Sequence, residues 1–497
     1  MQKHRLTSPL AACTVSLLLF ATTHSPLRAA DSDQKPNILF ISVDDLRPQT
    51  RADGHQFMVT PNMDRLAETG RLFHRHYVQA PTCGASRYSL LTGQYQKRPA
   101  SYGNGAFSLF QDGHAPTSLP GWFRQHGYHT MQSGKISHSP DGFRDDRERI
   151  AAGGVQNTYR TAPHLHFTNP DDPEVPGAWD EFDTPVGPWQ TGWGAFFAYD
   201  EGKTRHSGRS PAVEMADVED AGYPDGLMAD AAVAALAKLR NLDKPFFYAL
   251  GFYKPHLPFN APRKYWDLYD PAEIDISHVD PLARRGGEFF GAYSITPAQI
   301  TEDEAKLREV IHGYYACVSY IDAQVGKVLD ALDELGLADN TIIVLWGDHG
   351  FHLGELGYWG KHTLHEHSMR SAFMMRVPGM PHAGEATHSI VGSVDIYPTL
   401  VELAGLPVPD HLDGASFAET LRDPQADPIG FAIGFESKQS QTLRTHRHRL
   451  IEGSGAPRLF DHESDPGERE NIAANETETT TSLREQLQAL LEARKAK

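Results

Sequence analysis

The chain has 497 residues, enough for one large α/β domain with a smaller partner, or for roughly three domains of ~150 residues each. Hydrophobic residues make up 40% and charged residues 22%, so the chain can bury a core, which excludes disorder, collagen and coiled coil. Asp and Glu number 64 against 46 Lys and Arg, a formal charge of −18, and this acidic balance argues against nucleic-acid binding and membrane-surface binding.

Residues 1–30 have the features of a secretory signal peptide. They combine a positive start at residues 3–5, an apolar run at 15–21 and a small-residue exit at 29–30. The apolar run is shorter than the ~20 residues that a bilayer span needs, and no other stretch is long enough. We therefore predict an exported protein, periplasmic or extracellular, with no membrane span.

Short apolar runs and helical periodicity alternate along the rest of the chain. Predicted strands cover residues 37–43, 245–251 and 341–346, and predicted helices cover residues 60–69, 228–239 and 301–335. This alternation favours an α/β fold with a large, mixed, mainly parallel sheet flanked by helices. In such sheets the site lies at the carboxyl ends of the strands, which is where two pairs, Asp44-Asp45 and Asp348-His349, fall.

Two regions depart from this pattern. Residues 95–224 are rich in Gly, Pro, Trp, Tyr and His with little periodicity, and we predict long loops over the site. Strand-like pieces at 431–436, 443–452 and 458–461 precede a closing helix at 480–496. We therefore predict a signal peptide at 1–30, a catalytic α/β domain at 31–425, and a C-terminal α+β subdomain with a small antiparallel sheet at 426–497.

The adjacent carboxylates of Asp44 and Asp45 are costly to hold close together unless a cation neutralises them. A hard divalent ion would do so, and Asp348 and His349 could complete its ligands. An imidazole is an unusual ligand for Ca²⁺, so His349 is the weakest member of the set. The alternative, that each pair is a turn or helix-cap feature, stays open.

Two cysteines remain once the signal peptide is removed. Cys317 lies in an apolar helical run and is most simply a buried small hydrophobe. Cys83 lies in a small-residue turn that leads into a helix, a setting that calls for a different explanation.

The segment Cys83-Gly84-Ala85-Ser86-Arg87 resembles the core motif of type I sulfatases, in which the cysteine is oxidised to formylglycine. Ala85 departs from the more common proline. The resemblance is closest to iduronate-2-sulfatases at residues 251–259 and in the spacing of Lys135 and His138. Further matching stretches, in the order of the family, are residues 36–48, 90–94, 133–135, 254–256, 347–350, 395–399 and 459–471.

This resemblance implies an alkaline-phosphatase-like fold, a calcium ion and a maturation enzyme that generates formylglycine. The implied Ca²⁺ ligands are Asp44, Asp45, Cys83 as formylglycine, Asp348 and His349. The implied catalytic residues are Arg87 and Lys135, which hold the aldehyde hydrate, His138 as the base, and His256 and Lys361, which grip the sulfate. One of the last two would protonate the leaving sugar oxygen. For each of these residues an ordinary loop, turn or surface role is the competing interpretation.

The chemistry is consistent with this set of residues. Sulfate ester hydrolysis needs a nucleophile that can be regenerated, charge stabilisation and a proton for the leaving alcohol. An aldehyde hydrate has two hydroxyls on one carbon, so one can attack sulfur while loss of a proton from the other expels sulfate. A bound cation would lower the pKa of the attacking hydroxyl.

The leading functional hypothesis is a secreted sulfatase acting on uronic-acid-type sugars of a polysaccharide such as a glycosaminoglycan. Alternatives are a phosphate or phosphonate ester hydrolase, a choline-sulfatase-like enzyme for small esters, and a glycan-binding protein whose Cys83 stays unmodified. Arg205 or Arg209 could meet a uronate carboxylate, with loop packing as the competing role. The aromatic residues that could stack on sugars are Trp189, Trp193, Phe196, Phe197 and Tyr199.

Overall fold

The computed structural model describes residues 35–152, 161–280 and 292–495. The predicted signal peptide, residues 1–30, lies outside the described residues, as does the last residue of the closing helix predicted at 480–496. No helix within the described ranges is both long enough and apolar enough to cross a membrane.

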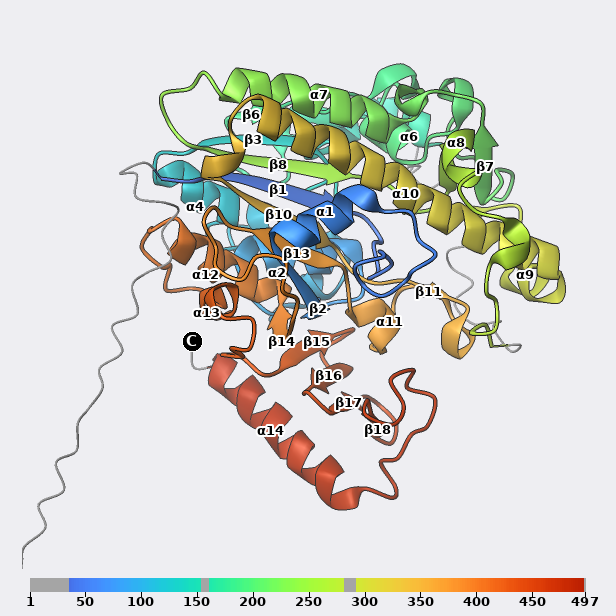
Figure 1. Cartoon of the computed structure of the whole chain (residues 1–497), viewed down its shortest axis with the longest axis vertical. Coiled ribbons are helices and arrows are strands. Elements are labelled where there is room, and N and C mark those ends of the chain that lie inside the picture. The colour runs from blue at the N-terminus through green and yellow to red at the C-terminus, as the bar shows by residue number, and fades with distance from the viewer. Residues whose placement is uncertain (1–34, 153–160, 281–291, 496–497) are drawn as a thin grey trace, which may run out of the picture.

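An eight-stranded sheet forms the centre of the molecule, in the order β14-β2-β13-β10-β1-β8-β3-β6 (Figure 1). Its strands are β1 (Asn37–Val43), β2 (Arg71–Tyr77), β3 (His129–Gly134), β6 (Glu181–Phe182), β8 (Phe246–Phe252), β10 (Thr341–Gly347), β13 (Phe373–Arg376) and β14 (Thr387–Gly392). Strand β1 pairs in parallel with β10 and β8, β3 pairs in parallel with β8, and β13 is antiparallel to both of its neighbours. The predicted mixed, mainly parallel sheet is confirmed.

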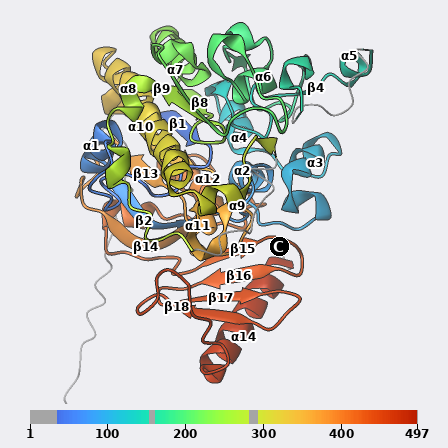
Figure 2. The ribbon, with the colours of Figure 1, turned by 90° about the vertical axis from the view of Figure 1, so that its right-hand side faces the viewer.

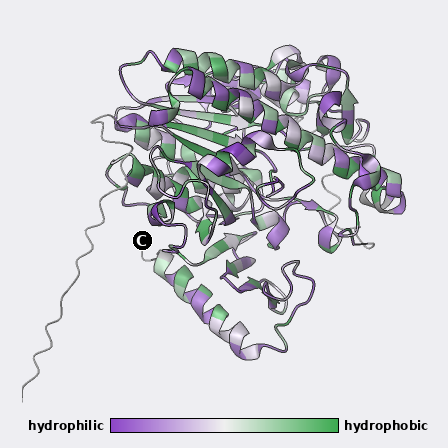
Figure 3. Ribbon diagram, in the orientation of Figure 1, coloured by the Kyte–Doolittle hydropathy of each residue, from purple (hydrophilic) through white to green (hydrophobic). Residues whose placement is uncertain are grey.

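Helices cover both faces of this sheet, so its central strands are apolar on both sides. In β1, Leu39 and Ile41 pack in one apolar cluster, whereas Ile38 and Phe40 pack in another. This is the alternation that a strand buried on both faces requires. Figure 3 accordingly shows the central strands as apolar between helices with polar outer faces.

Helices α1 (Pro61–Thr69), α7 (Pro224–Leu239) and α10 (Glu304–Glu334) lie on one face, and α2 (Cys83–Thr92), α4 (Leu119–Gln125) and α12 (Ser393–Leu403) lie on the other (Figures 1 and 2). The helix predicted at 301–335 is in fact two, α9 (Pro297–Glu302) and α10. The break falls at Asp303, whose side chain accepts hydrogen bonds from the amides of Ala305 and Lys306 and so caps α10.

The interval 95–224, predicted as loops, contributes a central strand, β3. The pattern concealed this strand because its inward-facing side chains are mostly polar and find partners inside the protein. Ser133 accepts a hydrogen bond from the Tyr248 hydroxyl at 3.0 Å, and Thr130 bonds to the carboxylate of Asp180. Buried polar groups with partners cost little free energy, so an apolar run is not required here.

The C-terminal segment forms a four-stranded antiparallel sheet of β15 (Ala432–Phe435), β16 (Gln441–Arg444), β17 (His448–Glu452) and β18 (Arg458–Asp461). The piece predicted at 443–452 spans the hairpin of β16 and β17. Helix α14 (Thr477–Lys495) packs on this sheet, and Figure 2 shows the unit below the main body. The small C-terminal antiparallel sheet is confirmed, whereas the domain boundary at 425–426 stays a prediction.

The remaining helices and strands are short. They are α3 (Ser108–Gln111), α5 (Arg147–Ala152), α6 (Gly192–Phe196), α8 (Arg263–Trp266), α11 (Glu366–Met369), α13 (Ala418–Arg422), β4 (Phe143–Asp145), β5 (Thr168–Pro173), β7 (Val213–Ala216), β9 (Phe259–Pro262), β11 (His352–Leu353) and β12 (Trp359–Gly360).

Candidate active site

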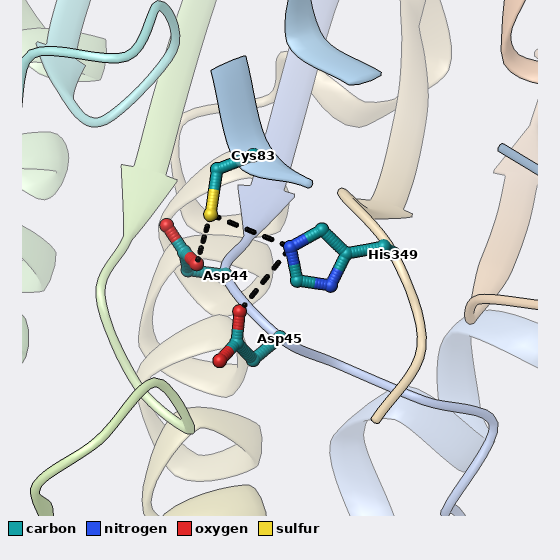
Figure 4. A group of neighbouring side chains, drawn as sticks. All are labelled: Asp44, Asp45, Cys83 and His349. Atoms are coloured by element: carbon teal, nitrogen blue, oxygen red, sulfur yellow. Dashed lines mark hydrogen bonds and ion pairs between the residues drawn. The ribbon is translucent and has the colours of Figure 1, made fainter. Parts of the chain in front are cut away.

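Neighbouring parallel strands deliver most of the predicted site residues to one edge of the sheet. Asp44 and Asp45 follow β1, and Asp348 and His349 follow β10. The segment after β8 carries His256, and the segment after β3 carries Lys135 and His138. Cys83 is the first residue of α2, and Figure 4 shows its thiol pointing toward Asp44 and His349.

A tight turn after β1 allows both aspartates to face the site. Asp45 has a φ of 62°, a left-handed conformation that Asp tolerates better than most residues. Its amide donates to Asp348 Oδ1 at 2.9 Å, and its carbonyl accepts from the Tyr314 hydroxyl at 2.8 Å. Gly347 permits the close approach, because a Cβ there would lie 2.3 Å from the Leu46 carbonyl oxygen. The turn is therefore held by the end of β10 and by α10.

The side chains of Asp44, Asp45, Cys83 and His349 form a buried group whose ligand atoms lie within 4.8 Å of one another. His349 Nδ1 lies 2.9 Å from the Gly350 carbonyl, to which it donates. In the neutral ring the Nε2 lone pair then faces Asp45 Oδ1 at 3.4 Å. Lone pairs that face one another at this distance favour a cation between them.

A second observation supports a cation here. Asp45 Oδ2 is buried and has no hydrogen-bond partner among the described residues. Burial raises the pKa of Asp45 well above its usual range despite the nearby Lys361 and His349. A carboxylate in this setting lacks positive charge, which a hard divalent ion would supply. The donor set therefore fits such an ion, with the imidazole as its least usual member.

Arg87 and Lys135 already balance the neighbouring acids. The Arg87 guanidinium lies 3.0 Å from Asp348 Oδ2 and 3.3 Å from Asp44 Oδ2, and Lys135 Nζ also pairs with Asp44 Oδ2. Burial raises the pKa of Asp44, but Lys135 and Arg87 outweigh it and hold that pKa well below its usual range. Asp44 is thus ionised, whereas one oxygen of Asp45, Oδ2, has no partner among the described residues.

Lys361 approaches Cys83 directly. Its Nζ lies 2.9 Å from Cys83 Sγ and also donates to Asp45 Oδ1. Lys361 is 6% exposed, so the surface-lysine interpretation is wrong. Burial lowers the pKa of Lys361, but Asp45 and Cys83 raise it above its ordinary value, so the ammonium keeps its proton. Burial also raises the pKa of the Cys83 thiol, and Asp44 adds to the rise.

A cavity of about 670 Å³ lies over Cys83, and we call it the catalytic cavity. Its lining includes Lys135, Lys361 and two imidazoles, His138 and His256. Burial lowers the pKa of both imidazoles, helped by Lys135 at His138 and by Lys361 at His256, so both rings are neutral. All the predicted site residues therefore lie in this cavity or directly beneath it.

Three residues that support or line the site were not predicted from the sequence. Lys254 is buried, and its ammonium donates to the carbonyls of His256 at 3.0 Å and Pro258 at 2.7 Å. Asn104 Oδ1 accepts the Gly84 amide at 2.9 Å and so anchors the start of α2. His362 also lines the catalytic cavity. Nothing in the sequence around it distinguished it from the other histidines nearby. Only Lys254 lay inside a recognised stretch, residues 254–256.

The predicted sugar-stacking residues divide into two groups. Trp193, Phe196 and Phe197 line the catalytic cavity, whereas Trp189 and Tyr199 do not. Of the two predicted arginines, Arg205 lines the cavity with its guanidinium 3.6 Å from the centroid of the Phe197 ring. Arg209 lies outside it and lines another hollow. The loops after β3 therefore build an aromatic wall that carries one cation.

Glu366, His462 and Glu468 form a second acidic group, which we call the closing cluster. Arg449 of β17 lies between its two carboxylates, with Nη2 2.6 Å from Glu366 Oε2 and Nε 2.6 Å from Glu468 Oε1. Glu468 Oε2 accepts from His365 Nδ1 at 2.8 Å and from the Glu366 amide at 3.0 Å. Protein groups satisfy these oxygens, so the cluster needs no metal and joins the C-terminal sheet to α11.

Comparisons with known proteins agree with this geometry. A family model described as Sulfatase matches residues 36–406, and one described as N-sulphoglucosamine sulphohydrolase, C-terminal, matches residues 354–497. The chain is 30% identical to a sulfatase of Formosa agariphila, over 89% of this chain and 83% of that protein. It is 32% identical to iduronate 2-sulfatase of Mus musculus, over 78% of this chain and 72% of that protein.

Solved structures share the fold. A phosphonate monoester hydrolase of Agrobacterium radiobacter aligns with a TM-score of 0.73 at 22% identity, covering 93% of this chain and 96% of that one. An alignment at this identity concerns the fold alone.

Proposed function

The chain belongs to the sulfatase family of sulfuric ester hydrolases, and from this premise we propose that it removes sulfate from a uronic-acid-type sugar of a polysaccharide. The observation that carries the proposal is the placement of Cys83. Its sulfur lies at the base of a cavity, 2.9 Å from the Lys361 ammonium and beside buried carboxylates. The anionic, tetrahedral sulfate ester bound there would meet positive charge and the reactive group together.

We propose that Asp44, Asp45, Asp348 and His349, together with the modified Cys83, hold Ca²⁺. When bound, the ion lowers the pKa of the nucleophilic hydroxyl and polarises a sulfate oxygen. The unpartnered Asp45 Oδ2 and the inward-facing Nε2 of His349 support this donor set.

We propose that Cys83 is converted to formylglycine, which supplies a hydroxyl nucleophile when hydrated. Arg87 anchors the acids beneath it through Asp44 and Asp348. Lys135 lines the cavity above Asp44, and with Lys361 it provides two ammonium groups for the sulfate oxygens. These charges are buried, so their attraction for the substrate anion is little screened by solvent.

The groups that can transfer protons are the imidazoles of His138 and His256 and the ammonium of Lys361. His138 is neutral because burial and Lys135 lower its pKa, so its ring can accept a proton. His256 Nδ1 donates to the Leu257 carbonyl at 2.6 Å, which leaves Nε2 as the acceptor atom of the neutral ring. Lys361 carries a proton at Nζ. The group that protonates the leaving oxygen is thus Lys361 or His256. His256 could do so once the negative charge of the bound sulfate favours the protonated form of its ring.

Arg205 supports a uronate over a choline ester as the substrate. Its guanidinium lies in the cavity wall, where it can pair with a carboxylate. A quaternary ammonium in the same position would meet a like charge. Trp193, Phe196 and Phe197 offer apolar surface for a sugar ring.

Hydrolysis of a phosphate or phosphonate ester is the second candidate. Both anions are tetrahedral, and the cations around Cys83 do not by themselves distinguish sulfur from phosphorus. The fold is shared with a phosphonate monoester hydrolase.

We also propose export through the predicted signal peptide at residues 1–30, and maturation by a formylglycine-generating or equivalent enzyme. Amino-terminal sequencing of protein from the culture medium or periplasm should begin near Asp31. Recovery of the chain with residues 1–30 intact would contradict export with cleavage.

The decisive experiment combines mass spectrometry with turnover. The Cys83 peptide from protein produced with the maturation enzyme should be lighter than its thiol form. Aryl sulfate should be cleaved faster than aryl phosphate or phosphonate, and Cys83→Ala should lower kcat/KM by about a thousandfold or more. Full activity of Cys83→Ala would overturn the proposal, and preference for the phosphorus ester would favour the second candidate. A panel of sulfated oligosaccharides then defines the sugar.

A further inference from the structure

A second hollow of about 1030 Å³, which we call the distal cavity, lies beside the catalytic cavity. The two share residues 204–206 as a wall. Arg205 lines the catalytic cavity, whereas Thr204 and His206 line the distal cavity. Thr204 forms a β-bridge with Ala198, and side chains of an extended segment alternate between its two sides. The wall therefore presents Arg205 to the catalytic cavity and Thr204 and His206 to the distal cavity.

A second connection joins the two cavities. The Gly208 amide donates to the Ala292 carbonyl, and the Ser294 amide donates to the Ser210 carbonyl, each at 2.9 Å. Ala292 and Tyr293 line the catalytic cavity, whereas Ser210 lines the distal cavity. These two hydrogen bonds join residues 208–210 to residues 292–294, and the joined segments lie between the two cavities. A sugar chain that reaches over this wall would occupy both.

The distal cavity has the groups that an anionic sugar requires. Its charged members include Arg209 and Lys203, and Gln190, Ser210 and His206 add hydrogen-bonding groups. Lys203 already pairs with Glu201 at 2.6 Å. Arg209 has no carboxylate partner within the described part of the chain. An unpaired guanidinium on a chain with a net charge of −18 is a ready site for an anion.

The one carboxylate in the distal cavity does not oppose this. Glu214 accepts hydrogen bonds from the Tyr223 hydroxyl at 2.7 Å and from the Asp200 amide at 2.8 Å. Burial raises its pKa. Both hydrogen bonds go to Oε2, which is therefore engaged in holding the loop, and no ion pair joins Glu214 to Arg209 among the described residues.

We propose that the distal cavity binds a second anionic sugar of the glycan whose sulfate ester lies over Cys83, with Arg209 pairing to its carboxylate or sulfate. This rests on the proposed sulfatase function and extends it, since the substrate becomes an oligosaccharide instead of a single sugar. Arg205 and Arg209, which the sequence offered as alternatives, then act on different sugars of one chain.

The test compares a long and a short substrate. Arg209→Ala should lower kcat/KM for a sulfated uronate oligosaccharide about tenfold, because a charged hydrogen bond to the second sugar is lost, and Arg209→Glu should lower it further, because it adds a like charge. Turnover of aryl sulfate, which is too small to reach the distal cavity, should not change. Arg65→Ala is the matched control, since Arg65 lies on α1 and pairs with Asp330.

Substrates altered at the second sugar identify the anion. If Arg209 binds the carboxylate, a carboxyl-reduced oligosaccharide should lose its dependence on Arg209; if it binds a sulfate, an oligosaccharide desulfated at that sugar should lose it. Unchanged oligosaccharide kinetics in both Arg209 variants, or an equal loss on aryl sulfate, would overturn the proposal.

A binding measurement separates this proposal from the proposed function. If the wild-type protein cleaves neither substrate, the proposed function fails. Calorimetry with the intact sulfated uronate oligosaccharide, which then stays uncleaved, still reports on the distal cavity: weaker binding to Arg209→Glu than to wild type supports it, and equal binding rejects it.

Discussion

The acidic group around Cys83 and the closing cluster differ in how their charge is balanced. Each brings carboxylates and an imidazole together within the protein. In the closing cluster a single guanidinium, that of Arg449, binds both carboxylates. Around Cys83, Arg87 pairs with Asp44 and Asp348 and Lys361 pairs with Asp45 Oδ1, but Asp45 Oδ2 stays buried with no partner among the described residues. The proximity of acids therefore identifies a metal site only after the neighbouring cations have been counted.

Substituting one carboxyl in each cluster should separate their roles most strongly. Asp45→Asn keeps the shape of the side chain but removes charge, so kcat/KM for aryl sulfate should fall on the order of a thousandfold. Glu468→Gln should leave kcat/KM of the folded protein within about threefold, because the closing cluster touches no substrate. Equal losses of activity in the two variants, measured on material of equal folded content, would contradict the distinction.

Removing the central cation of the closing cluster should have the next largest effect. Arg449→Met leaves two buried carboxylates without their shared partner, which should lower the free energy of unfolding by about 3–5 kcal/mol. Urea unfolding followed by circular dichroism measures this loss. Arg447, which pairs with Asp461 from an exposed position, supplies the matched control: Arg447→Met should cost far less stability than Arg449→Met, because an ion pair open to solvent is weak. A comparable cost at both positions would mean that the cluster is not a buried ion-pair network.

Calcium should stabilise the protein through the site around Cys83 alone. Ion at a hundred times its Kd should add about 2.7 kcal/mol to the free energy of unfolding. Thermal unfolding with calcium and with a chelator should show this shift in wild type and in Glu468→Gln, but not in Asp45→Asn. A calcium shift that persists in Asp45→Asn would place the ion elsewhere.

The smallest effect concerns pH and has a defined sign. Burial raises the pKa of Glu468, but Arg449 and His365 hold it well below the usual value of 4.5. Its ionised form thus stabilises the folded state above that value, and this contribution is lost as the pH falls through the folded-state pKa. The stability difference between wild type and Arg449→Met should therefore shrink between pH 7 and pH 3.5. A difference that stays constant, or grows, would contradict this assignment.

Much of the site could be predicted because its residues are tied to strand ends. The apolar runs of β1 and β10 place Asp44 and Asp348 at one edge of the sheet, and the motif around Cys83 identifies the nucleophile. The resemblance named Lys361 as a site residue, but its burial and its contact with Cys83 needed the fold, since nothing in its neighbouring residues indicates burial. Strand β3 was missed because its inward polar groups are paired by partners distant in the sequence, such as Tyr248 and Asp180.

The aromatic wall could be predicted only in part. Composition indicated sugar-facing rings, but which rings face the catalytic cavity depends on how irregular loops pack. Trp189, for example, donates to the Tyr199 carbonyl and lines the distal cavity instead of the catalytic cavity. Loop conformation also decided that Arg205 and Arg209 face different cavities.

The position of Glu468 has a consequence for the order in which the enzyme matures. This residue holds the amide of Glu366 and the ring of His365, a few positions after Lys361. It is synthesised more than a hundred residues after Lys361 and later still than Cys83 and the aspartates. A nascent chain on the ribosome can therefore assemble the acidic half of its reaction centre early, but the segment bearing Lys361 gains its support only after Glu468 has been added.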